Sequence, residues 1–145
     1  MSDLYDDDIA AWAEQQADAL RRRATNEIDW ENVAEEIADV GKRDRDRIFG
    51  ALRTALTHLL KWQFQSEARS NAWRAAVVKA RERIAKLIED SPSLQDYPAE
   101  QLIRAYAAAR LIAEAETGLV GLPEACPWTV EQVRDHAFWP ARPSE

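Results

Sequence analysis

The stretch that decides the fold is residues 30–65, WENVAEEIADVGKRDRDRIFGALRTALTHLLKWQFQ, which contains no proline. At 100° per residue its apolar side chains fall within one broad stripe, a pattern typical of an amphipathic helix. Asp44 and Arg45 interrupt that stripe midway, inside the charged run 42–47. The helix is therefore either bent or broken near Gly41, or continuous with a partly polar centre. We favour one continuous helix over residues 30–65.

Further helices are predicted on both sides of this stretch. Residues 3–23 carry carboxylates in the first turn and three arginines at the end, as the helix dipole favours. A serine or asparagine at 70–71 can cap the next helix. Pro98 suits the first turn of the one after it, which Gly118 ends. The expected helices cover residues 3–23, 71–90, 98–117 and 129–135. The apolar stripe expected on 98–117 is Leu102, Ile103, Tyr106, Ala109 and Ala113.

Length and composition favour a single all-α domain over residues 1–145. A chain of 145 residues has the usual size of one domain. Four glycines and six prolines leave little material for the turns of a β-protein. Four amphipathic helices joined by short links predict an antiparallel four-helix bundle, with a short C-terminal helix and a proline-rich tail. The tail is expected to cover an open seam with Trp128, Phe138 and Trp139.

The sequence shows no membrane segment and no sign of an oxidising compartment. No apolar run approaches the roughly 18 residues of a membrane span. The start MSDLYDDD is acidic where a signal peptide is basic. Cys126 is the only cysteine, which excludes an internal disulfide and a cysteine-cluster metal site. We therefore expect a cytoplasmic protein without a membrane partner.

Charge is distributed unevenly along a chain whose net charge is −7. Residues 42–86 hold twelve Lys and Arg against four Asp and Glu, and the rest of the chain holds seven against twenty-two. A basic middle can bind a polyanion, whereas acidic and basic helices can also simply pack side by side. Arg74 and Arg81 flank the apolar stripe of the helix 71–90, and flanking charges are typical of solvated rims. We do not expect nucleic acid to be the main partner, because the pI is near 4.9.

The residue patterns assemble no recognisable catalytic or metal centre. His58 lies at the edge of the apolar stripe, and we interpret it as a core-edge histidine with one satisfied hydrogen bond rather than a metal ligand. Glu35 could act as a base, but acidic residues early in a helix more often stabilise its dipole. Phosphate loops and nucleophile motifs are absent, and Cys126 has no adjacent histidine or cysteine. We predict no catalytic residues, no metal and no cofactor.

Three groups of motifs run through most of the chain. They are Asp29-Trp30-Glu31-Asn32 with Glu35-Glu36-Ile37, the stretch HLLKWQFQ at 58–65 with Arg69-Ser70 and Trp73, and PEACPWT at 123–129. Together they resemble the family catalogued as domain of unknown function 29. The resemblance implies a bacterial protein with a compact helical-bundle fold, and it brings no established activity, cofactor or catalytic residue. Ala72 departs from the serine of the family motif, which argues against a polar role there. A shared site would lie around Glu35, His58, Lys61, Trp62, Arg69 and Trp73.

Three functions remain open, and we rank them by the features that favour each. A non-enzymatic protein-interaction module, an adaptor or antitoxin-like partner, comes first, because a surface rich in opposite charges orients a protein partner. A small enzyme or ligand-binding protein with a site around His58, Trp62 and Arg69 comes second. Nucleic-acid binding through residues 42–86 comes third. A homodimer is a further expectation, because a long amphipathic helix can extend its stripe across a dimer interface.

Overall fold

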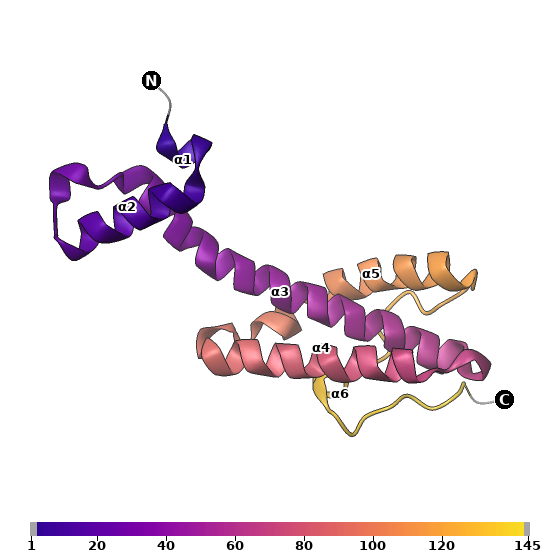
Figure 1. Ribbon diagram of the computed structural model, residues 1–145. Coiled ribbons are helices and arrows are strands. Elements are labelled where there is room, and N and C mark those ends of the chain that lie inside the picture. The colour runs from indigo at the N-terminus through magenta and orange to yellow at the C-terminus, as the bar shows by residue number, and fades with distance from the viewer. Residues whose placement is uncertain (1–2, 144–145) are drawn as a thin grey trace. The chain divides into compact units, whose positions relative to one another are not determined.

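A computed structural model describes residues 3–143, and every regular element in that range is helical (Figure 1). The predicted all-α class is confirmed. The longest element is continuous from Trp30 to Phe64, so the expected unbroken helix through Gly41 is also confirmed. The α-helices are α1 Leu4–Asp7, α2 Ile9–Arg21, α3 Trp30–Phe64, α4 Asn71–Asp90, α5 Tyr97–Thr117 and α6 Val130–Arg134, with 3-10 turns η1 Thr25–Glu27, η2 Ser66–Ala68 and η3 Pro92–Leu94.

The chain groups into two compact units, with the boundary inside α3. The N-terminal unit comprises residues 1–43 and the C-terminal unit residues 44–145. One domain over residues 1–145 stays a prediction, which unfolding experiments can test.

In the N-terminal unit the expected helix over residues 3–23 is wrong as a single element. It is broken at Asp8, whose backbone leaves the helical region at φ −153° and ψ 89°. The Asp8 carboxylate instead accepts the backbone N–H of Ala11 at 3.1 Å and caps α2. Aspartate side chains compete with the helical backbone for hydrogen bonds in this way. Asp8, which was expected in the first turn of a helix over 3–23, is therefore the N-cap of α2.

Two buried side chains hold α2 against the start of α3. Trp12 and Gln16 are both buried. The Trp12 indole donates to the Asp29 carboxylate at 3.1 Å. Gln16 accepts the backbone N–H of Asp29 at 2.7 Å and donates to the carbonyl of Glu27 at 3.2 Å. This amide therefore fixes the short link between the two helices.

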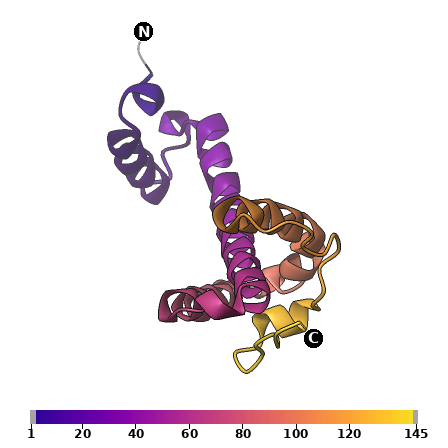
Figure 2. The same cartoon turned by 90° about the vertical axis from the view of Figure 1, so that its right-hand side faces the viewer.

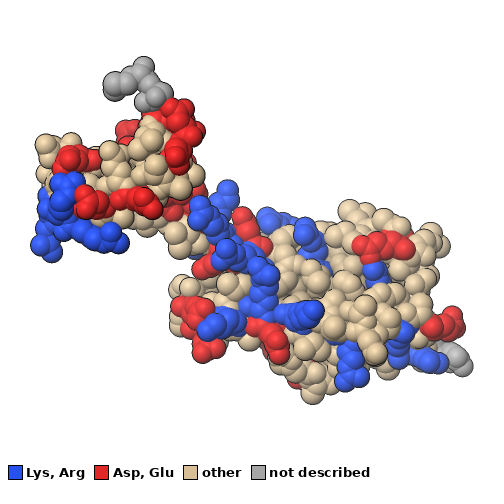
Figure 3. Space-filling model, viewed as in Figure 1, with Lys and Arg blue, Asp and Glu red and all other residues tan. Residues whose placement is uncertain are grey.

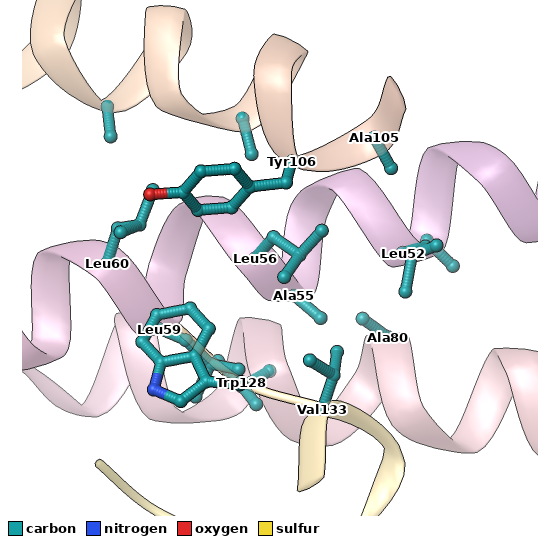
Figure 4. Packing of buried hydrophobic residues seen from close by; sticks show 14 of the residues in the cluster. Leu52, Ala55, Leu56, Leu59, Leu60, Ala80, Ala105, Tyr106, Trp128 and Val133 are labelled. Carbon is teal, nitrogen blue, oxygen red and sulfur yellow. The ribbon is translucent and has the colours of Figure 1, made fainter. Parts of the chain in front are cut away.

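The C-terminal unit contains the hydrophobic core. Figure 4 shows Tyr106 of α5 packed over Leu56 and Leu60 of α3, with Trp128 and Val133 closing the other side. In Figure 1 α4 runs back along α3. The helix α6 contacts α4, and Figure 2 shows α6 and the tail in yellow. The core cluster draws on three long helices and α6. The antiparallel four-helix bundle stays a prediction, because α2 belongs to the other unit.

Most helix ends in the C-terminal unit lie where local chemistry predicts them. Ser70 caps α4 by accepting the backbone N–H of Trp73 at 3.2 Å. Gly118 ends α5 with φ 74°, in the left-handed region. Thr129 and Gln132 form a capping box at the start of α6. The α4 bounds match the expected 71–90, and α5 and α6 begin or end within one residue of expectation.

The expected stripe on α5 is wrong at Ile103. That side chain is 85% exposed, while Ala105, Tyr106, Ala109 and Ala113 are buried. The reason is that α5 carries apolar residues on more than one face, so periodicity alone did not decide which face turns inward. The predicted packing of the three tail aromatics on the core is confirmed. Trp128 is buried in the core, and Phe138 and Trp139 pack against it.

Candidate functional site

The corner between α3 and α4 is tied back onto α3 by Arg69. Its Nε donates to the carbonyl of Trp62 at 2.7 Å, which satisfies a backbone oxygen that the end of the helix leaves without an intrahelical partner. The same bond lays the guanidinium over the Trp62 ring, with 4.7 Å from the guanidinium carbon to the ring centroid. Arg69 therefore stabilises the turn between α3 and α4 and also places a positive charge there.

Tryptophan rings and guanidinium groups form a stack along this corner. The ring centroids of Trp62 and Trp139 are 4.8 Å apart. Arg74 and Arg81 place their guanidinium carbons 5.6 Å and 5.2 Å from the Trp139 centroid. We call Trp62, Arg69, Arg74, Arg81 and Trp139 the tryptophan–arginine cluster. Within residues 3–143 none of its three arginines is in an ion pair with a carboxylate. Arg69 and Arg81 donate to backbone carbonyls instead, and all three guanidinium groups lie over indole rings.

Lys61 and Trp73 lie next to this cluster and are engaged within the protein. The Lys61 side chain is buried and forms an ion pair with Glu116, at the end of α5. Its Nζ lies 5.6 Å from the centroid of the Trp73 ring. The charge of Lys61 therefore links α3 to α5, which leaves this residue little capacity to bind an external anion.

His58 is engaged within its own helix, α3. The His58 Nδ1 lies 2.9 Å from the carbonyl oxygen of Thr54, four residues earlier in α3. Because a carbonyl oxygen only accepts, Nδ1 carries the proton, and the half-buried ring is a core-edge histidine of the kind expected. Glu35 is exposed in the N-terminal unit. Residues 3–143 contain no group of three potential metal-ligating side chains.

Arg81 is the cluster residue that sequence reasoning placed wrongly. It was expected on a solvated rim, but it is 2% exposed. Its Nε donates to the carbonyl of Val133 at 2.7 Å, and Nη2 donates to the carbonyl of Phe138 at 2.8 Å. Burial lowers the pKa of the guanidinium, which the nearby Asp135 opposes. A signal was present, because residue 81 continues the spacing of Val77 and Ile84 at i+4 and i−3.

A groove runs between α3 and α4 on the C-terminal unit, with a volume of about 740 Å³. Its floor is built from glycine, alanine and one threonine, and a Cβ added at Gly50 would meet no atom within 4 Å. Basic side chains dominate its rim, and Figure 3 shows Lys and Arg gathered over this part of the two helices. The small lining residues are Gly50, Ala51, Thr54, Ala76 and Ala80, and the charged ones are Arg47, Arg53, Lys79, Glu82 and Arg83.

Most cations at the rim of the groove form no ion pair with a carboxylate among the described residues. Arg47 pairs with Asp44 at 3.3 Å within α3. Across the described residues Arg53, Lys79 and Arg83 are in no ion pair. The groove was not predicted as a site. The sequence feature that could have indicated it is the basic segment 42–86, because α3 and α4 bring several of its positive charges to one groove.

Cys126 is half-buried and packs against the core. Its thiol lies 3.3 Å from the carbonyl oxygen of Trp128, and burial raises the pKa of the thiol. Nucleophilic thiols need a lowered pKa and access to solvent. The cysteine therefore serves as a small packing residue against the core.

Comparison with known families matches the chain to the family described as Domain of unknown function DUF29, over residues 4–139. The chain belongs to this family. The match spans nearly all of the chain, so both units of the DUF29 chain and its tail fall within the family pattern. Neither the curated proteins nor the solved structures yield a match. Among the described residues of this DUF29 protein, no helix combines the length and hydropathy needed to cross a membrane.

Proposed function

We propose that this DUF29 protein is a non-enzymatic protein-interaction module whose α3–α4 groove binds an acidic amphipathic helix of a partner protein. The observation that carries the proposal is the groove itself, with a floor of small residues and a rim of four cations against one carboxylate. A helix laid into such a groove buries its apolar face on the floor and offers its carboxylates to the rim.

Charge complementarity favours a protein partner of this kind over an uncharged one. Rim cations steer an acidic partner and raise its association rate, and they reject basic competitors. The small floor residues let the backbone of an incoming helix approach closely. An adaptor or antitoxin-like role follows, since such proteins act by stoichiometric docking.

The test uses a fluorescent helical peptide with leucine and alanine on one face and glutamate on the other. We expect the wild-type protein to bind it in anisotropy titrations, more weakly as salt is raised. The double variant Arg53→Glu/Lys79→Glu should weaken binding by at least about tenfold, equivalent to about 1.4 kcal/mol. Arg21→Glu/Arg23→Glu makes the same change of charge outside the groove and should bind as wild type does.

Two outcomes would overturn the proposal. One is a groove variant that binds the peptide as well as wild type does. The other is tighter binding of duplex DNA than of the peptide, lost in the same variant, which would assign the groove to a nucleic acid.

A second candidate is ligand binding at the tryptophan–arginine cluster. The favouring observation is that Nη2 of Arg69 and Nη1 of Arg81 are buried with no hydrogen-bond partner among the described residues. A planar anion could satisfy such donors while stacking on indole. Quenching of tryptophan fluorescence by aromatic carboxylates, lost in Trp62→Phe, would support this role. No response to such compounds in the wild type would reject it.

The setting we propose is the bacterial cytoplasm. The free thiol of Cys126 is compatible with a reducing compartment. For the architecture, the antiparallel four-helix bundle also stays a proposal, supported by the four helices of thirteen or more residues, α2 to α5. Fractionation of the native host with an antibody to the chain tests the location.

A further inference from the structure

The N-terminal unit carries an apolar helix face that it does not cover itself. On α3, Trp30 is 57% exposed and Ile37 is 67% exposed. At 100° per residue they share about 60° of arc with Ala34 and Gly41. Large apolar side chains with this exposure, lined up on one face of a helix, mark an interaction surface. The small residues between them let a second helix approach closely.

The other side of the same helix segment is already occupied. Glu36 accepts a hydrogen bond from the Tyr5 hydroxyl at 2.7 Å and forms an ion pair with Arg43 at 3.3 Å. The hydrogen bond to Glu36 raises the pKa of Tyr5 to about 12. These contacts hold α1 on α3. The Trp30 indole N–H donates to the carbonyl of Thr25 at 3.2 Å, and more than half of the Trp30 and Ile37 side chains nevertheless stays exposed.

The charges beside the apolar face are ordered along the helix in a way that favours an antiparallel pair of such helices. Glu31 and Glu35 lie on one flank, and Lys42 lies on the same flank two to three turns later. All three are exposed, and within the described chain none is in an ion pair. Acidic residues at one end and a basic residue at the other complement a second identical segment only when that segment runs in the opposite direction.

We propose that residues 30–43 of α3 pair with the same segment of a second copy of this chain, antiparallel about a two-fold axis near Ile37. In this pairing Ile37 packs against its equivalent, and Ala34 and Gly41 allow close contact. Lys42 of each copy faces Glu31 and Glu35 of the other. A parallel pair in register would bring like charges together, which is unfavourable.

The experiment exploits the two-fold symmetry. Lys42→Glu makes the flank wholly acidic, and Glu31→Lys/Glu35→Lys makes it wholly basic. In sedimentation equilibrium we expect wild type to form a species of twice the 16.5 kDa chain mass. Each charge variant alone should dimerise at least about tenfold more weakly. An equimolar mixture of the two variants should restore the dimer, because each acidic flank then faces a basic one.

A matched pair of isoleucines separates this face from other apolar surfaces. Ile37→Ser should abolish the dimer, whereas Ile103→Ser on α5, which is also exposed, should leave it intact. A wild-type monomer at all concentrations overturns the proposal. So does a dimer that survives Ile37→Ser, or a mixture of charge variants that stays monomeric. The surface is separate from the α3–α4 groove, so peptide binding there is an independent result.

Discussion

The Arg81 guanidinium is joined to the backbone carbonyl of Val133 by a hydrogen bond of 2.7 Å across 52 positions of sequence. Two further bonds from Nη2 reach the carbonyls of Phe138 and Gln132 at 2.8 Å and 3.3 Å. A single side chain of α4 thus holds both α6 and the tail. It also lies over the Trp139 ring, so it supports the aromatic stack at the corner.

Replacement of Arg81 by methionine is predicted to destabilise the C-terminal unit. Methionine keeps much of the volume but leaves the carbonyls of Val133 and Phe138 buried without their donor. Each unpaired buried group costs about 1–3 kcal/mol, and we expect a total loss of about 2–4 kcal/mol in the free energy of unfolding. Urea denaturation followed by circular dichroism measures this loss.

Arg83→Met is the matched control on the same helix. Arg83 is exposed, and its removal should change the free energy of unfolding by no more than about 0.5 kcal/mol. Equal stability of the Arg81 and Arg83 variants would show that the hydrogen bonds of Arg81 contribute nothing to the free energy of unfolding.

Much of the fold was predictable because its helices are governed by local rules. The cap at Ser70, the left-handed stop at Gly118 and the capping box at Thr129 each act within a few residues. The break at Asp8 was missed because aspartate suits both the first turn and the cap, and sequence did not decide between them. Exposure of Ile103 was missed because α5 offers two apolar faces, and only packing selects one.

The site was less predictable because it depends on contacts between distant segments. Trp62 and Arg69 lie seven residues apart, and their stacking follows from the turn that joins α3 to α4. The approach of Trp139 to Trp62, by contrast, depends on the path of the tail. Predicting the burial of Arg81 required knowing that two carbonyls of α6 and one of the tail would accept its hydrogen bonds. Local periodicity carries no information on such partners.

The C-terminal unit is predicted to fold without residues 1–43. Its core cluster and the side chains packed against it all lie between Phe49 and Trp139. The N-terminal unit buries only Trp12, Gln16, Ala19 and Ile28 of its described residues, too little to offset chain entropy. A fragment of residues 44–145 should show a cooperative thermal transition, and a peptide of residues 1–43 should be largely unfolded. A fragment 44–145 that melts without cooperativity would contradict this.

Two glycine-to-alanine substitutions are predicted to have opposite effects. Gly118 has φ 74°, which is strained for alanine, so Gly118→Ala should cost about 1 kcal/mol or more. Gly50 lies inside α3, where an added Cβ meets nothing within 4 Å, so Gly50→Ala should stabilise by about 0.5–1 kcal/mol. Midpoints of urea denaturation compare the two. A shift of the same sign in both variants would contradict the assigned backbone roles.

Tyr106 is predicted to make the protein sensitive to alkali. Burial raises the pKa of its phenol to about 12, and the hydroxyl donates to the carbonyl of Pro123. Unfolded tyrosine titrates near pH 10, so between about pH 10 and 12 the unfolded chain loses a proton that the folded chain keeps. The stabilisation is fully present below pH 10 and is lost as pH rises through 12, by about 2–3 kcal/mol.

Tyr106→Phe removes this ionisation, so the difference in the free energy of unfolding between wild type and variant should narrow by that amount from pH 9 to 12. Urea denaturation at each pH measures this difference, and a constant difference would show that the phenol titrates alike in both states.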